Sequence, residues 1–203
     1  MKQTFGTCFV IWVVMSGGLL TDPPCAMAAS AQVFYDQTSW DDAVPVQETL
    51  DFTGFSDAEW LSDQYADQGV TFSGTSQIVG PGGQFPNDGW GVWGIGGSWV
   101  HFDEPMNWIG AHHPGSIKYR LFLGETLVYE SPSFIHGGSN IGNFSGVMLD
   151  IDFDTAWIHR SGSSGPNSFY DDLHYGNWAM VPAPGALAMF GLAAFGAARR
   201  RRA

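Results

Sequence analysis

The sequence predicts an all-β protein whose body is an antiparallel β-sandwich of jelly-roll type. Short runs of β-branched and aromatic residues recur between turn-forming clusters across 32–177, as in sandwiches and barrels. Few stretches of this region have a helical period. The 203 residues suit one domain with terminal signals. We therefore divide the chain into an N-terminal segment (1–28), a β-sandwich domain (29–178) and a C-terminal tail (179–203).

The body contains a series of predicted strands separated by turn residues. They are 48–52, 69–73, 98–102, 108–112, 117–123, 126–130, 144–153, 156–160 and 169–175. Apolar and acidic residues alternate in 148–154 (MLDIDFD), which is typical of a strand with one buried face. Gly124 and Glu125 lie between two apolar runs and predict a hairpin turn. The stretch 57–68 is the one helical candidate, with a coil or short turn as the alternative.

The N-terminal segment predicts a secretory signal peptide. Lys2 precedes the apolar run 5–20, and Ala26 and Ala28 form the A-x-A pattern of small residues that a signal peptidase accepts. Cleavage is expected after Ala28. The alternative is an N-terminal helix that stays in the membrane as an anchor.

The placement of cysteines and charges excludes several kinds of chemistry. Cys8 and Cys25 both precede the predicted cleavage point, so the exported body would have no disulfide, thiolate nucleophile or zinc–thiolate site. The body has three basic residues, Lys118, Arg120 and Arg160, against 19 Asp and Glu, a net charge near −16 with neutral histidines. Because this charge repels phosphates, nucleic acid is not an expected partner.

The C-terminal tail has three parts in a fixed order. The first part is a short proline motif made of Val181, Pro182, Ala183 and Pro184. An uncharged segment, 185–198, follows and predicts a transmembrane helix of about 21 Å, which is short for a bilayer core of about 30 Å. The third part is the membrane stop, Arg199, Arg200, Arg201 and Arg202. These arginines would keep the C-terminal end in the cytoplasm. An amphipathic or buried helix is the alternative.

This order of proline motif, short helix and arginine cluster resembles the PEP-CTERM sorting signal. That family has Pro-Glu-Pro, usually after Val, and Ala183 stands where the family has glutamate. The resemblance implies export through the inner membrane of a Gram-negative bacterium and transient anchoring there by the C-terminal helix. It also implies processing by an exosortase, a membrane-embedded transpeptidase, and delivery to the cell surface or extracellular matrix. The stretches 63–74, 99–110 and 168–176 look similar to the β-jelly-roll domains often found on such proteins.

Tryptophans in and beside the glycine-rich stretch 87–99 are the candidate ligand-binding residues. They are Trp90, Trp93 and Trp99. Exposed indole faces can stack on sugar rings, so our hypothesis is that they bind exopolysaccharide. Trp90 and Trp93 are expected to be exposed in a loop, because their flanking glycines offer little support for a strand. The alternative is that these indoles fill the core.

Three acidic residues in the first and last predicted strands are candidate metal ligands. Glu48, Asp171 and Asp172 would come together if those strands are neighbours. Calcium prefers several oxygen ligands, so a structural Ca²⁺ near the ends of the domain is the hypothesis. The alternative is a solvated acidic surface.

No catalytic signature stands out in the sequence. The chain has no H-E-x-x-H, P-loop, dinucleotide fingerprint or G-x-S-x-G pattern. We therefore expect a non-enzymatic surface or matrix protein. A purely structural matrix component without a specific ligand is one alternative. A carbohydrate-active enzyme is another, and it would need two facing carboxylates in a cleft.

Overall fold

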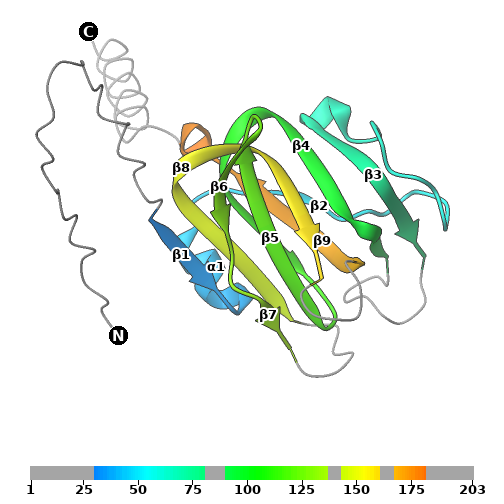
Figure 1. Cartoon of the computed structure of the whole chain (residues 1–203), viewed down its shortest axis with the longest axis horizontal. Helices are drawn as coiled ribbons and strands as arrows, with labels where there is room; N and C mark the ends of the chain where they lie inside the picture. Colours follow the sequence, from blue (N-terminus) through cyan, green and yellow to red (C-terminus); the bar gives the residue numbers. More distant parts are fainter. Residues whose placement is uncertain (1–29, 81–89, 137–142, 161–166, 182–203) are drawn as a thin grey trace, which may run out of the picture.

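The computed structural model describes residues 30–80, 90–136, 143–160 and 167–181. The described residues are mostly β, which confirms the predicted fold class. The strands are β1 (Ala31–Phe34), β2 (Glu48–Leu50), β3 (Val70–Val79), β4 (Gly91–His112), β5 (Ser116–Leu123), β6 (Thr126–Glu130), β7 (Phe134–Ile135), β8 (Phe144–His159) and β9 (Ser168–Gly176). A single α-helix, α1 (Gln37–Ala43), and two 3-10 turns, η1 (Ala66–Gln68) and η2 (Trp178–Met180), complete the described elements (Figure 1).

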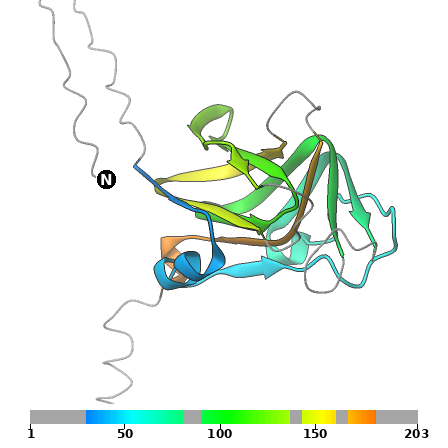
Figure 2. The same ribbon diagram turned by 90° about the horizontal axis from the view of Figure 1, so that it is seen from below.

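The sheet curls into two layers because β4 and β8 are long enough to belong to both (Figures 1 and 2). In one layer, β3 pairs with the first part of β4, which pairs with the last part of β8, followed by β5 and β6. In the other layer, β2 pairs with β9, which also pairs with β4. The start of β9 pairs with 92–94 of β4 and the rest of β9 pairs with 108–112 of β4. The first part of β8 and then β1 continue this second layer. The arrangement fits a β-sandwich, and the jelly-roll connectivity stays an expectation.

The long strands correct two predicted strand boundaries. The stretches 98–102 and 108–112 are parts of one strand, β4, and the stretches 144–153 and 156–160 are parts of β8. The register between these strands shifts between His101 and Met106, as at a β-bulge, which bends a strand without ending it. The polar segment inside β4 therefore marks the bend between layers and is not a turn.

Two clusters of buried side chains stabilise the fold. The larger one lies between the layers, and Phe52 makes edge-on ring contacts there with Tyr65, Phe72 and Tyr170 at centroid distances of 5.7–6.1 Å. The smaller cluster lies where α1 covers the layer that contains β9 (Figure 2). It consists of Phe34, Trp40, Val44, Trp108 and Phe144.

The helix of this fold is not where the sequence predicted it. The stretch 57–68 forms only the 3-10 turn η1, in line with the alternative of a short turn. Instead, α1 follows Asp36, whose side chain accepts a hydrogen bond from the Ser39 N–H at 2.9 Å. This is an N-cap, and it supports a helix whose one buried residue is Trp40.

Other local predictions are confirmed. Leu149 and Phe153 are buried while Asp150 and Asp152 are exposed, as the alternation in 148–154 indicated. Gly124 lies in the turn between β5 and β6 with a φ of +58°, a left-handed conformation that glycine adopts without strain. The predicted first and last strands are neighbours, as β2 and β9.

Candidate functional site

The structure places the predicted ligand-binding tryptophans on or beside β4. Trp93 and Trp99 lie within the strand, so the expectation that Trp93 stands in an unsupported loop is wrong. Trp93 opposes Gln77 of β3, and its ring is nearly parallel to that of Phe169 in β9, with centroids 5.9 Å apart. Trp90 directly precedes the strand and packs against the larger core cluster. For Trp90 the core alternative therefore fits better than an exposed loop.

Glycine favours the strand at this place for a packing reason. A Cβ on Gly94 would overlap the hydroxyl groups of Ser98 and Ser168, so only glycine lets these segments approach. Gly94, one of the glycines that suggested a loop, is therefore required by close strand packing.

Half-buried aromatic side chains gather on the outside of the layer that contains β5 and β6. We call this surface the outer aromatic face. It consists of Trp93, Trp99, Phe122, Trp157, His159 and Phe169. Their neighbours in sequence, such as Val100 and Ile158, are buried in the core. The period of two along each strand therefore points the aromatic rings outward.

The centre of the outer aromatic face is a cross-strand pair of indoles. Trp99 of β4 lies directly opposite Trp157 of β8, and the rings are within 13° of parallel with centroids 5.6 Å apart. Phe122 of β5 contacts Trp99 at 5.5 Å, and His159 stacks on Trp157 at 4.1 Å. Directly opposed aromatic pairs of this kind stabilise a sheet, and here they also hold the rings in place.

Gly97 allows the Trp157 ring to lie against β4. Its φ is +94°, and a Cβ at this position would overlap the indole of Trp157. Sequence reasoning did not single out Trp157. The signal in the sequence was its place between the apolar residues Ala156 and Ile158, but its pairing with Trp99 depends on a register that the sequence alone does not reveal.

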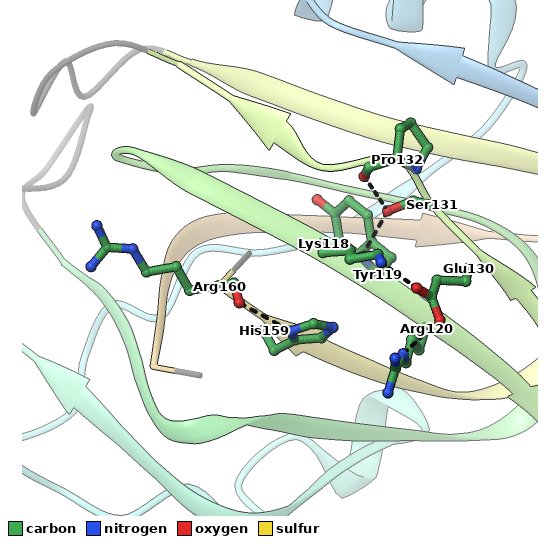
Figure 3. A network of polar contacts seen from close by, with 8 residues as sticks. All are labelled: Lys118, Tyr119, Arg120, Glu130, Ser131, Pro132, His159 and Arg160. Atoms are coloured by element: carbon green, nitrogen blue, oxygen red, sulfur yellow. Dashed lines mark hydrogen bonds and ion pairs between the residues drawn. The ribbon is translucent and has the colours of Figure 1, made fainter. Parts of the chain in front are cut away.

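Charged side chains lie next to the outer aromatic face, and Figure 3 shows Lys118, Arg120 and Glu130 near His159. The guanidinium carbon of Arg120 lies 5.2 Å from the Trp157 ring centroid, a cation–π geometry. Its Nε donates to Glu130 Oε2 at 2.8 Å, and Lys118 Nζ pairs with the other oxygen of the same carboxylate. The hydrogen bond from Lys118, followed by that from Arg120, lowers the pKa of Glu130. This carboxylate is therefore charged at neutral pH.

His159 is a neutral member of the face. Burial lowers the pKa of its imidazole below the usual value of 6.5, and the nearby Arg120 and Lys118 lower it further. Its Nδ1 lies 3.1 Å from the carbonyl oxygen of Arg160, which follows at the end of β8 (Figure 3). The ring therefore acts as a neutral stacking partner for Trp157 near pH 7.

The predicted metal ligands are not brought together. The register places Glu48 opposite Tyr175 and Leu50 opposite Leu173, so Glu48 lies several residues along the strand from Asp171 and Asp172. Asp171 is buried and its Oδ1 accepts the backbone N–H of Asp172 at 2.7 Å. Within the described ranges, no group of three or more His, Cys, Asp or Glu side chains is arranged to hold a metal ion. The predicted ligand set is therefore not assembled there.

Glu48 instead lines a pocket of about 310 Å³ with other acidic side chains. The pocket lies between the start of β2, the η1 turn and the bend of β4. Its acidic residues are Glu48, Asp67, Asp103 and Glu104, and Met106 and Tyr175 contribute to its wall.

Histidines form a buried cluster that sequence reasoning did not predict. His112 Nδ1 lies 3.3 Å from Asp172 Oδ2, and the rings of His112 and His174 are 6.0 Å apart. The next residue, His113, is fully buried and packs on His136 with centroids 5.2 Å apart. The two adjacent histidines thus have different neighbours, as expected for side chains on opposite faces of a strand.

The sorting residues lie at the edge of the described body. Val181 follows η2, and its N–H donates to the Trp178 carbonyl at 3.2 Å. The remaining predicted signal residues lie outside the described residues, and they are Ala26, Ala28, Pro182, Ala183, Pro184, Arg199, Arg200, Arg201 and Arg202. The predicted helix 185–198 lies outside them as well. Among the helices in the described ranges, none has the length and apolarity needed to cross a membrane.

Comparison with known proteins identifies the C-terminal segment. Residues 181–202 match the PEP-CTERM protein-sorting motif. No curated protein and no solved structure matches the chain. The fold and the motif together define an exported all-β protein whose sorting depends on an exosortase, a membrane protein.

Proposed function

We propose that this exported protein is a non-enzymatic component of the cell surface or extracellular matrix of a Gram-negative bacterium and that it binds exopolysaccharide. The sorting motif at 181–202 supports the destination. The observation that supports the binding is the parallel indole pair of Trp99 and Trp157 on the outside of the sheet.

Sugar rings are suited to a face of this kind. The C–H groups of a pyranose pack on aromatic rings, and an indole N–H can donate to a hydroxyl. The rings of Trp93 and Trp99 are half-buried, so each is fixed by its neighbours and still reaches the surface. Fixed side chains lose little conformational entropy when a ligand binds.

Replacing Trp99 with alanine is expected to weaken polysaccharide binding by about tenfold or more, the effect of losing a central aromatic contact. Affinity electrophoresis and calorimetry on the purified full chain in detergent would measure it. Trp178→Ala is the matched control, since Trp178 is 50% exposed and lies in η2 against Trp108, away from the outer aromatic face. Equal affinities for the two variants, or no binding of any polysaccharide by the folded protein, would contradict the proposal.

Introducing the family's glutamate at Ala183 is expected to increase C-terminal processing. The change Ala183→Glu restores Pro-Glu-Pro, and mass spectrometry of the mature C-terminus in the native host would measure the processed fraction. Ala179→Glu adds the same charge at an exposed position outside the motif and should leave processing unchanged. An intact end that retains residues 199–202 in both variants would indicate a stable anchor and argue against processing.

The acidic pocket makes a carbohydrate-active enzyme the second candidate. Glycosidases use a pair of carboxyl groups that flank the bond to be cleaved, and the pocket beside Glu48 also holds Asp103 and Glu104. Release of reducing ends from a polysaccharide would support this candidate. A polymer that is bound and stays intact would support the non-enzymatic proposal.

A further inference from the structure

We propose that the outer aromatic face selects acidic polysaccharides, and that the guanidinium of Arg120 binds the carboxylate of a uronic acid beside Trp157. This inference rests on the proposed function, because it specifies the kind of polysaccharide that the face would bind.

Positive charge is unevenly distributed in this acidic body. The body has a net charge near −16, with only Lys118, Arg120 and Arg160 as basic residues. Lys118 and Arg120 alternate along β5 with the buried residues Ile117, Tyr119 and Leu121, so both point to the outer face. Arg160 directly follows the last residue of β8, and Lys118 pairs in register with His159 (Figure 3). Two of the three cations of an acidic body, Lys118 and Arg120, therefore lie on the outer face beside the aromatic rings.

Glu130 holds the Arg120 guanidinium through its Nε–H. Glu130 accepts its Nε–H at 2.8 Å and also pairs with Lys118. A single carboxylate thus faces two cations, which leaves a local positive excess. Within the described part of the chain, this bond occupies the Nε–H of Arg120 and not the terminal N–H groups. Those groups form the fork that binds a carboxylate through two parallel hydrogen bonds.

The positive charge of Arg120 lies next to an aromatic ring that can stack on a sugar. The guanidinium is held 5.2 Å from the Trp157 ring centroid, so a carboxylate bound there would bring its own sugar ring next to the indoles. The opposite end of the face is acidic, because Asp154 of β8 accepts the Gly124 N–H at 2.9 Å and Glu125 follows in the turn. An acidic polymer would therefore be repelled from this end and attracted to the end with Lys118 and Arg120.

The test compares two forms of one polymer. Full-length protein in detergent is titrated with polygalacturonate and with the same polymer after chemical reduction of its carboxyl groups. We expect the acidic form to bind about tenfold more tightly, the effect of a charged hydrogen-bonded pair. Equal affinities for the two forms would overturn the inference, and this arm needs no variant.

Two variants test whether Arg120 causes the preference for the acidic polymer. Arg120→Gln should weaken binding of the acidic polymer about tenfold and leave the reduced polymer unaffected, since a neutral amide cannot replace the fork. Glu130→Gln should strengthen binding of the acidic polymer, because it removes the competing carboxylate. An Arg120→Gln variant that keeps its melting temperature and the wild-type preference for the acidic form would overturn the assignment.

The outcomes also separate this inference from the proposed function. If both polymers bind equally and Trp99→Ala abolishes both, the face binds polysaccharide without charge selection, and only the inference fails. If neither polymer nor any neutral polysaccharide binds, the proposed function fails with it.

Discussion

Replacing Trp40 with alanine is expected to lower the free energy of unfolding by about 3–5 kcal/mol, as for other large aromatic residues in cores. Trp40 has no exposed surface. It contacts Phe34 edge-on and Phe144 at a tilt, each with ring centroids 5.3 Å apart. Its indole N–H donates to Gln47 Oε1. Removing the ring would leave a cavity and an unsatisfied partner.

The backbone beneath Trp40 makes this site intolerant of change. A Cβ on Gly146 would overlap the indole, and one on Gly110 would come close to it. The glycines in β4 and β8 therefore leave space for the Trp40 ring. Trp40 is also the buried residue of α1, and a helix of seven residues is not stable without tertiary contacts. We expect α1 to separate from the sheet in the variant.

Urea denaturation followed by far-ultraviolet circular dichroism would measure this effect. Trp60→Ala serves as the control because its side chain is 52% exposed, and it should cost less than about 1 kcal/mol. Losses of similar size in the two variants would contradict the role that we assign to the Trp40 cluster.

Acidification from pH 7 to pH 5 is expected to destabilise the protein through its buried histidines. Burial is the main cause that lowers the pKa of His113 to about 3, and His136 and His112 contribute. Burial also lowers the pKa of His174 to about 4, with a further contribution from His112, while Asp172 and Asp41 oppose the shift. Both values lie well below the usual 6.5 for histidine.

The direction of the effect follows from proton binding. Between pH 6.5 and the lowered values, the unfolded chain binds protons at His113 and His174 that the folded chain does not bind. Stability is therefore complete above pH 6.5 and is lost as the pH falls, by at most about 1.4 kcal/mol per pH unit for each histidine. At pH 5 the combined loss would be about 4 kcal/mol.

Melting temperatures measured from pH 7 to pH 5 would test this expectation. His174→Gln should reduce the slope, because the glutamine does not titrate. His101→Gln is the control, since His101 lies on the outer side of β4 and contacts Ser73 and Thr155 outside the buried cluster. A melting temperature that stays constant over this range would contradict the expectation.

Local patterns were sufficient for the features that depend on neighbours in sequence. The alternation in 148–154 and the turn at Gly124 predicted a half-buried strand and a hairpin, and both are confirmed. The tail was predicted as a PEP-CTERM sorting signal, and the match at 181–202 confirms it. These features need no knowledge of how distant parts of the chain meet.

Local patterns failed where a distant contact decides the conformation. The glycines around Trp93 suggested a loop, yet Gly94 is needed in β4 because the hydroxyls of Ser98 and Ser168 lie against it. The short segment of α1 has no strong helical period, and it is stabilised by the contact of Trp40 with the sheet. In both cases a tertiary contact overrides the local preference.

The sequence by itself determined the class of this protein: an acidic all-β body joined to a sorting signal. Only the tertiary structure decided which side chains share a surface. It placed Trp157 between Trp99 and Arg120, and it separated Glu48 from Asp171. The physical reason is that composition and periodicity act along the chain. A binding face depends on the register between strands that are far apart in sequence, and that register is set by packing in the core.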